Sequence, residues 1–137
     1  MLGFLKRKCR AIQKIIEYYF FPRWQNLYWK WRHIYDPNWA DNYLRTVYHP
    51  HRNQIIKAIL KFQPVNSIAE IGCASGPNII RLVKAFPNKR IIGVDISHRA
   101  IKLAKSFFYK NKYKNVEFYV SKADDLSILK DKSIDLL

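Results

Sequence analysis

The sequence predicts an α/β fold in which helices cover both faces of a parallel sheet. Short apolar runs of strand length alternate with stretches of helical periodicity through the second half of the 137 residues. The first two runs are separated by a turn with two glycines and a helical stretch, and the second run ends in Asp95. This alternation implies right-handed crossovers, so we expect a three-layer parallel sheet of about four strands with a helical amino-terminal cap.

Each element of the sheet domain follows from its own residue pattern. Strands are expected at the apolar runs 67–71, 90–95 and 116–120, with a fourth beginning at Ile134. Helices are expected at 77–86, which opens with a proline, and at 98–110. Because the sequence ends at Leu137, inside the fourth run, we expect a truncated, incomplete sheet whose open edge favours aggregation or dimerisation.

Three helices are expected before residue 66. Apolar residues at helical spacing predict a helix up to Phe21, which the following proline ends. Asp36, again followed by proline, is typical of a helix start, and this second helix is expected to run through Leu44. A third helix begins near Pro50, and its expected buried side consists of Ile55, Ile56, Ile59, Leu60 and Phe62.

A change of composition near residue 50 divides the chain. We expect a basic, aromatic-rich helical segment at residues 1–49 and the sheet domain at residues 50–137. The formal net charge is +15, and residues 1–35 hold eight Lys or Arg against the single acid Glu17. This predicts peripheral contact with an anionic membrane or nucleic acid, although a lysine-rich composition and an ordinary solvated helix face explain the same charges.

The two cysteines, Cys9 and Cys73, lie far apart and lack the spacing of a metal site. We therefore expect no disulfide, no metal centre and a reducing compartment. No apolar run approaches the roughly 18 residues of a membrane-spanning helix, and the start of the chain is a poor secretory signal. These observations predict a cytoplasmic protein.

The glycine turn after the first strand indicates which kind of ligand the chain could bind. A dinucleotide fingerprint would place glycines at positions 72, 74 and 77, but only Gly72 fits, so a dinucleotide is disfavoured. Glu70 sits near the carboxyl end of the strand, where a carboxylate repels a pyrophosphate and attracts a cation. Gly76 closes the turn, and Asp95 ends the next strand, where it is placed to accept hydrogen bonds from a ribose. A nucleoside that carries an ammonium and a sulfonium suits this arrangement.

Residues from about 50 to the end resemble the class I S-adenosylmethionine-dependent methyltransferases, whose fold is Rossmann-like. The stretch 70–76 resembles the first motif of that family, with Ala74 in place of its middle glycine. The stretch 93–97 resembles the second motif, in which an acid binds both ribose hydroxyls. The stretches 123–126 and 131–137 are similar to the adenine-side segment and the fourth strand.

The resemblance implies S-adenosylmethionine (SAM) as the cofactor. The implied cofactor-binding residues are Glu70, Gly72, Cys73, Ala74, Gly76, Asp95, Ile96, Ala123 and Asp124. The family often has an acid where this chain has Lys122, so Asp124 or a backbone carbonyl would take the adenine amino group.

Structural roles compete with several of these assignments. The glycines alone could permit a tight turn, and Asp95 alone could cap the following helix. Asp124 could belong to a solvated turn, and Cys73 is expected to act mainly through its backbone N–H.

The resemblance implies transfer of a methyl group to an unidentified acceptor, because the cofactor holds the activated methyl and the protein orients it. Catalytic residues are unknown and would follow Leu137. His49 and His51 could reach the cofactor, but a surface role is favoured. The alternative function is a non-catalytic SAM-binding or vestigial fragment.

Overall fold

The computed structural model describes residue 36 and residues 38–137. Its contacts divide the chain into two compact units, Met1–Trp39 and Ala40–Leu137, so residues 40–49 belong with the sheet. The expected helix up to Phe21 and the basic segment 1–35 lie outside the described residues. The domain bounds 1–49 and 50–137 stay a prediction.

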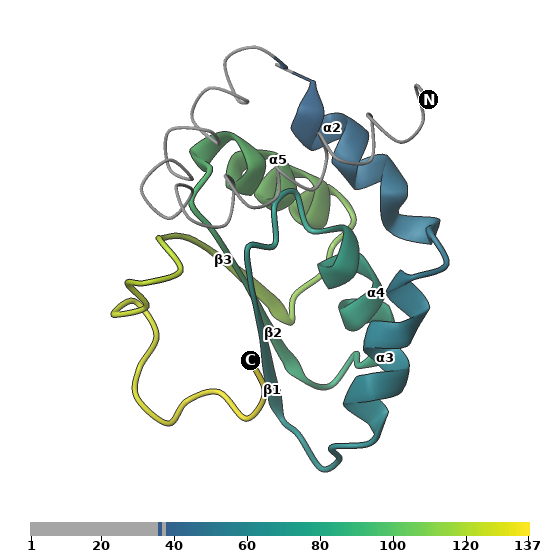
Figure 1. The fold of residues 1–137 in the computed structure, drawn as a ribbon, viewed down its shortest axis with the longest axis vertical. Helices are drawn as coiled ribbons and strands as arrows, with labels where there is room; N and C mark the ends of the chain where they lie inside the picture. Colours follow the sequence, from purple (N-terminus) through teal and green to yellow (C-terminus); the bar gives the residue numbers. More distant parts are fainter. Residues whose placement is uncertain (1–35, 37) are drawn as a thin grey trace, which may run out of the picture. The chain divides into compact units, whose positions relative to one another are not determined.

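The sheet is parallel, as predicted. Strands β1 (Ser67–Ile71), β2 (Arg90–Asp95) and β3 (Val116–Val120) lie in the order β1-β2-β3, as Figure 1 shows. On the free edge of β1, Ile68 forms a single parallel bridge with Leu136. The run expected to form a fourth strand from Ile134 therefore pairs beside β1, and the α/β parallel fold is confirmed.

Asp135 fastens the end of the chain to β1. Its Oδ2 accepts hydrogen bonds from the backbone N–H groups of Asn66 and Ser67, at 2.8 and 2.9 Å, and from the Ser67 hydroxyl at 2.9 Å. These bonds hold the pKa of Asp135 below its ordinary value. The next residue, Leu136, accepts from Ala69 N at 2.8 Å. One carboxylate thus sets the register of the added edge.

Helices lie against one face of the sheet. They are α3 (Arg52–Leu60), α4 (Pro77–Ala85) and α5 (His98–Lys110), and the last two match the predicted ranges to within a residue. Alternate strand residues point to this face and join the main apolar core, including Ile68, Ile91 and Phe118. The amphipathic faces of the helices complete that core, because an apolar stripe must be buried against another element.

The prediction for the buried side of α3 is wrong at two positions. Ile59 is buried and Ile55 and Ile56 are half-buried, but Leu60 is 57% and Phe62 is 62% exposed. Leu60 follows Ile59 by one residue, which turns its side chain about 100° away from the buried stripe. Phe62 lies beyond the last residue of the helix.

Two short helices precede α3. Helix α2 (Trp39–Leu44) ends where the sequence predicts, and the 3-10 helix η1 (Arg45–Tyr48) continues it directly. Asp36 Oδ1 accepts from Asn38 N at 3.3 Å, in keeping with the expected helix start. Among the described residues, no helix has the length and apolarity needed to cross a bilayer.

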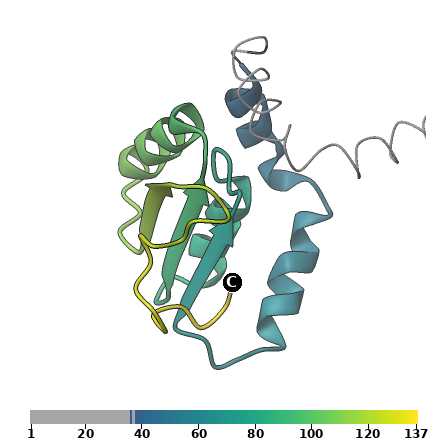
Figure 2. The ribbon, with the colours of Figure 1, turned by 60° about the vertical axis from the view of Figure 1, so that its left-hand side comes forward.

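The opposite face of the sheet is covered by the segment that follows β3, and Figure 2 shows this segment crossing the strands. A second apolar cluster forms there. It contains Ala69, Ile92 and Val94 from the sheet and Leu126, Leu129 and Ile134 from the covering segment. Ile92 and Val94 are fully buried, so the segment shields the centre of the sheet.

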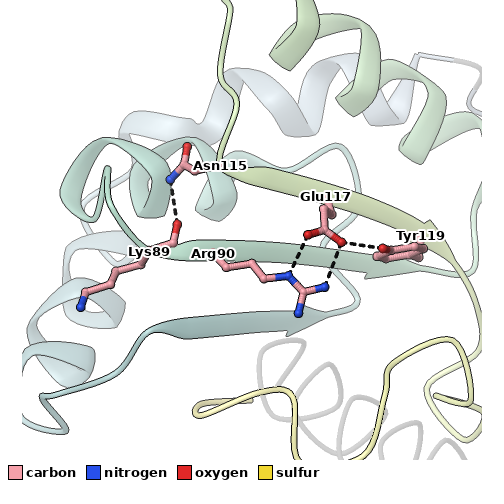
Figure 3. Close-up of polar contacts among 5 residues, drawn as sticks. All are labelled: Lys89, Arg90, Asn115, Glu117 and Tyr119. Atoms are coloured by element: carbon pink, nitrogen blue, oxygen red, sulfur yellow. Dashed lines mark hydrogen bonds and ion pairs between the residues drawn. The ribbon is translucent and has the colours of Figure 1, made fainter.

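Polar side chains occupy the margin of that second face (Figure 3). The Arg90 guanidinium donates to both oxygens of Glu117, from Nε at 2.7 Å and Nη2 at 3.0 Å. The Tyr119 hydroxyl donates to Glu117 Oε2 at 2.5 Å. The Arg90 and Tyr119 hydrogen bonds together lower the pKa of Glu117 to about 2. Nearby, Asn115 Nδ2 donates to the backbone oxygen of Lys89 at 2.9 Å.

Candidate functional site

The loop between β1 and α4 has an unusual backbone. Gly72 and Gly76 have φ values of +78° and +86°, and Ala74 has a φ of +50°. Left-handed conformations are easy for glycine and costly for residues with a Cβ, which explains the two glycines and marks Ala74 as strained. A Cβ added at Gly72 would meet nothing within 4 Å, whereas one at Gly76 would lie 3.2 Å from the Phe108 ring. Gly72 therefore faces open space, and Gly76 is packed against the core.

Hydrogen bonds fix this loop in place. Val94 O accepts from Gly72 N at 2.7 Å and from Cys73 N at 3.0 Å, which ties the start of the loop to β2. The buried Ser75 hydroxyl donates to Ala40 O at 2.6 Å, which ties its middle to α2. The loop is consequently held in its left-handed shape from two sides.

Asp95 faces the loop, as the nucleoside-binding prediction requires. Its Oδ2 accepts from Ala74 N and its Oδ1 from Ser97 N, both at 2.8 Å. The cap of α5 is Ser97, whose Oγ accepts from Ala100 N at 3.2 Å. Helix capping therefore does not account for Asp95.

Glu70 is a half-buried acid near the end of β1. Its Oε1 accepts from Asn78 Nδ2 at 2.6 Å, while its buried Oε2 has no hydrogen-bond partner in the described part of the chain. Burial raises the pKa of Glu70 to about 7, against the opposing effects of the Asn78 hydrogen bond and the Arg52 charge. The side chain also lines an apolar hollow of about 540 Å³ beside α3. An unsatisfied carboxylate oxygen in such surroundings is costly and calls for a donor.

Arg52 was missed by the sequence-based interpretation. It is only 3% exposed, and its guanidinium donates to Asn78 Oδ1 at 2.5 Å and to Thr46 Oγ1 at 2.6 Å. A signal was present, because Arg52 precedes Ile55, Ile56 and Ile59 at helical spacing and so shares the face of α3 that they form. A charge within an apolar stripe predicts a buried partner.

Cys73 is a packing residue in this structure. It is buried, and burial raises the pKa of its thiol, so the side chain stays protonated. A Cβ added at Gly93 would lie 2.9 Å from its sulfur and 2.8 Å from two ring carbons of Phe118. Glycine at position 93 therefore gives the loop room to pack against β2.

The adenine-side residues lie in more exposed places. Ile96, Ala123 and Asp124 are all exposed. Ser121 N donates to Asp95 O at 3.1 Å, so the segment that leads to Ala123 starts beside the end of β2. The structure thus gathers the loop residues with Glu70 and Asp95, and leaves Ala123 and Asp124 on the covering segment.

No metal centre forms within residues 38–137, where no group of three or more His, Cys, Asp or Glu side chains could hold an ion. The imidazoles of His49 and His51 meet at 2.5 Å between their Nδ1 atoms. Both are exposed residues at the junction of η1 and α3.

Comparison with known proteins identifies the fold. A family model described as a methyltransferase domain matches residues 66–137. The YcgJ protein of Bacillus subtilis is 27% identical with a TM-score of 0.53, over 64% of this chain and 37% of that one. A SAM-dependent methyltransferase from Aquifex aeolicus is 19% identical with a TM-score of 0.53, over 69% of this chain and 54% of that one.

A third similar structure is an SAH-bound methyltransferase from Podospora anserina, 20% identical with a TM-score of 0.51, over 58% of this chain and 36% of that one. The two less identical structures show the shared fold. The chain spans between about a third and a half of the lengths of these three proteins. None of the curated proteins matches the chain closely enough to count as a relative.

Proposed function

We propose that the chain, which belongs to the methyltransferase domain family, binds SAM at the glycine loop and serves methyl transfer to an acceptor. The observation that carries the proposal is the pair of acids beside that loop. Asp95 is hydrogen-bonded to the loop, and Glu70 lies near enough for the Asp95 charge to raise its pKa. Two acids and an open glycine backbone suit a nucleoside with a positively charged tail.

Glu70 would hold the amino-acid part of the cofactor. Its buried Oε2 needs a donor, and an ammonium supplies both a proton and a compensating charge. In surroundings of low dielectric this attraction is stronger than in water. Bound SAM supplies an activated methyl group on a sulfonium, so the chemical activation belongs to the cofactor.

Gly72 would let the backbone approach the cofactor. Its Cα faces open space, and any Cβ there would project into that space at a strained φ. Cys73, Ala74 and Gly76 would shape the rest of the cradle through the backbone.

Asp95 would bind the ribose. Each of its oxygens accepts one backbone N–H, and a carboxylate oxygen can accept a second hydrogen bond. Two hydroxyls can therefore be added without breaking the contacts that hold the loop. Ile96, Ala123 and Asp124 would lie on the adenine side.

The decisive test is calorimetry with S-adenosylhomocysteine. We expect Asp95→Ala to lose most of the affinity, on the order of 1.5 to 3 kcal/mol for each lost hydrogen bond to the charged group. Asp125→Ala is the matched control, because the side chain of this exposed acid accepts, among the described residues, only from Ser127 two positions further on. Absence of binding by the folded chain would reject the function, and unchanged affinity in Asp95→Ala would remove the ribose role.

The peripheral contacts of residues 1–35 and a cytoplasmic location remain separate predictions. We expect the basic segment to sediment with anionic vesicles at low salt and to be released at high salt, because screening weakens surface charge attraction. The absence of sedimentation at both salt concentrations would exclude the membrane contact.

A further inference from the structure

A buried cation on α3 is connected to the proposed cofactor site. A guanidinium removed from water is stable only when its donors meet acceptors. Arg52 meets this requirement through three groups. Its Nη1 reaches Asn78 Oδ1 at 2.5 Å, its Nη2 reaches Thr46 Oγ1 at 2.6 Å, and its Nε reaches Thr46 O at 3.0 Å.

Asn78 connects Arg52 to Glu70 by hydrogen bonds. Its amide oxygen accepts from Arg52, so its amide nitrogen is the group turned toward Glu70, where it donates to Oε1 at 2.6 Å. Arg52 has no acceptor group, so it selects this orientation of the amide. The hydrogen bond from the Asn78 amide then occupies Oε1 of Glu70 and leaves Oε2 as the oxygen available to a ligand.

We propose that Arg52, acting through Asn78, is a positioning residue that holds the Glu70 carboxylate charged and turned toward the amino group of the cofactor. The inference rests on the proposed function and adds a residue to it. Three of the five N–H donors of Arg52 are bonded to Thr46 and Asn78, and in this scheme Arg52 acts through Asn78 without touching the ligand.

The charges that face Glu70 set the direction of the effect. Arg52 from α3 favours the ionised form, and Asp95 from β2 opposes it. Asn78 from α4 favours the ionised form by its hydrogen bond, and the loop thiol of Cys73 stays protonated. Without Arg52, less opposes the effects of burial and of the Asp95 charge, so the pKa of Glu70 would rise further. A larger fraction of Glu70 would then be protonated at neutral pH and unable to balance the charge of an ammonium.

Arg81 provides a matched control. It connects α4 to the same neighbouring elements, donating from Nη1 to Val47 O at 3.3 Å in η1 and from Nη2 to Asn53 Oδ1 in α3. The pKa of Glu70 responds to burial, Asn78, Arg52 and Asp95, and not to the Arg81 charge. Arg81→Met therefore removes a similar bridge between helices and leaves the connection to Glu70 intact.

The first experiment needs no ligand. The carboxyl carbon of Glu70 is followed by NMR as the pH is changed, in the wild-type chain and in Arg52→Met, Arg52→Lys and Arg81→Met. We expect the midpoint to rise in Arg52→Met, to stay closer to wild type in Arg52→Lys, which keeps the charge, and to stay unchanged in Arg81→Met. If Arg52→Met does not fold, Asn78→Ala replaces it and should also raise the midpoint. An unchanged midpoint in folded Arg52→Met, or in Asn78→Ala where it takes its place, would overturn the inference.

The second experiment separates positioning from folding. Calorimetry compares S-adenosylhomocysteine with 5′-methylthioadenosine, which lacks the amino-acid part. At pH 7 we expect Arg52→Met to lose roughly tenfold or more in affinity for the first ligand and little for the second. Arg81→Met should bind both ligands normally.

Two outcomes would be adverse, and they are distinguishable. Equal losses for both ligands in Arg52→Met would show a merely structural role and overturn the inference. A folded wild-type chain that binds neither ligand would reject the proposed function instead, and the ligand-free titration would still decide whether Arg52 controls Glu70.

Discussion

Glu70 on β1 and Glu117 on β3 belong to the same sheet but lie in opposite electrostatic situations. Glu70 points to the helix-covered face, where burial raises its pKa to about 7. Glu117 points to the other face, where the hydrogen bonds of Arg90 and Tyr119 lower its pKa to about 2. One oxygen of Glu70 has no partner within residues 38–137, whereas both oxygens of Glu117 are bonded.

This difference distinguishes a candidate binding residue from a structural contact. Both oxygens of Glu117 already accept hydrogen bonds from Arg90 and Tyr119, so this carboxylate would gain nothing from a ligand. Glu70 has a buried oxygen that lacks a hydrogen-bond donor within the described residues, and it lies beside a loop that is strained at Ala74. Unsatisfied polar groups and strained backbone persist where surrounding structure holds them, and such places are commonly functional.

The largest expected effect is on the pH dependence of stability at Glu70. A pKa raised from 4.5 to about 7 means that the folded chain binds more protons in that interval, so stability falls as pH rises through it. The shift corresponds to a change of about 3 kcal/mol in the free energy of unfolding across this pH interval. Glu70→Gln has no titrating group at this position and should therefore lack this change. Denaturant unfolding at pH 5 and pH 8 measures it, and identical pH slopes in the two proteins would contradict the raised pKa.

Gly93→Ala tests the packing beneath the loop. The new Cβ would press on the Phe118 ring and the Cys73 sulfur, so we expect a loss of about 1 to 3 kcal/mol in the free energy of unfolding. Gly72→Ala is the comparison, because its Cβ meets no atom and only the backbone conformation is penalised. A neutral Gly93→Ala would mean that Phe118 and Cys73 can move aside.

Ala74→Gly should stabilise the chain. Relief of the left-handed strain exceeds the extra entropy that glycine brings to the unfolded state, for a net gain of up to about 1 kcal/mol. At the exposed helical position Ala58, the same exchange should cost about 1 kcal/mol. Thermal melts measure the sign of the stability change in both variants. A loss of stability in Ala74→Gly would show that Ala74 is not strained.

Glu117→Gln should have the smallest effect. The Arg90 and Glu117 side chains are 42% and 40% exposed, so solvent screening limits the pair to below about 1 kcal/mol. Because the pKa is lowered, any contribution is present above the ordinary value of 4.5 and is lost as pH falls toward about 2. Unfolding at low and high salt measures it, and a larger, salt-independent loss would remove the contrast with Glu70.

The predicted elements were recovered because their signals are local. Apolar runs, a proline at a helix start and glycines in a turn act through neighbouring residues, and the ranges of α4, α5 and all three strands follow from them. The errors at Leu60 and Phe62 arose because the apolar character of a residue does not decide which face of a helix finds a partner. Arg52 was missed because its acceptors Thr46 and Asn78 come from two other elements.

Sequence alone determined the order of the strands and helices, the turn with its two glycines and the acid that ends β2. Those features depend on side-chain periodicity and on allowed backbone angles, which each short segment carries within itself. Only the tertiary structure decided the state of Glu70. Its charge depends on how much water surrounds it and on a cation eighteen positions earlier in the chain, and folding alone brings these together.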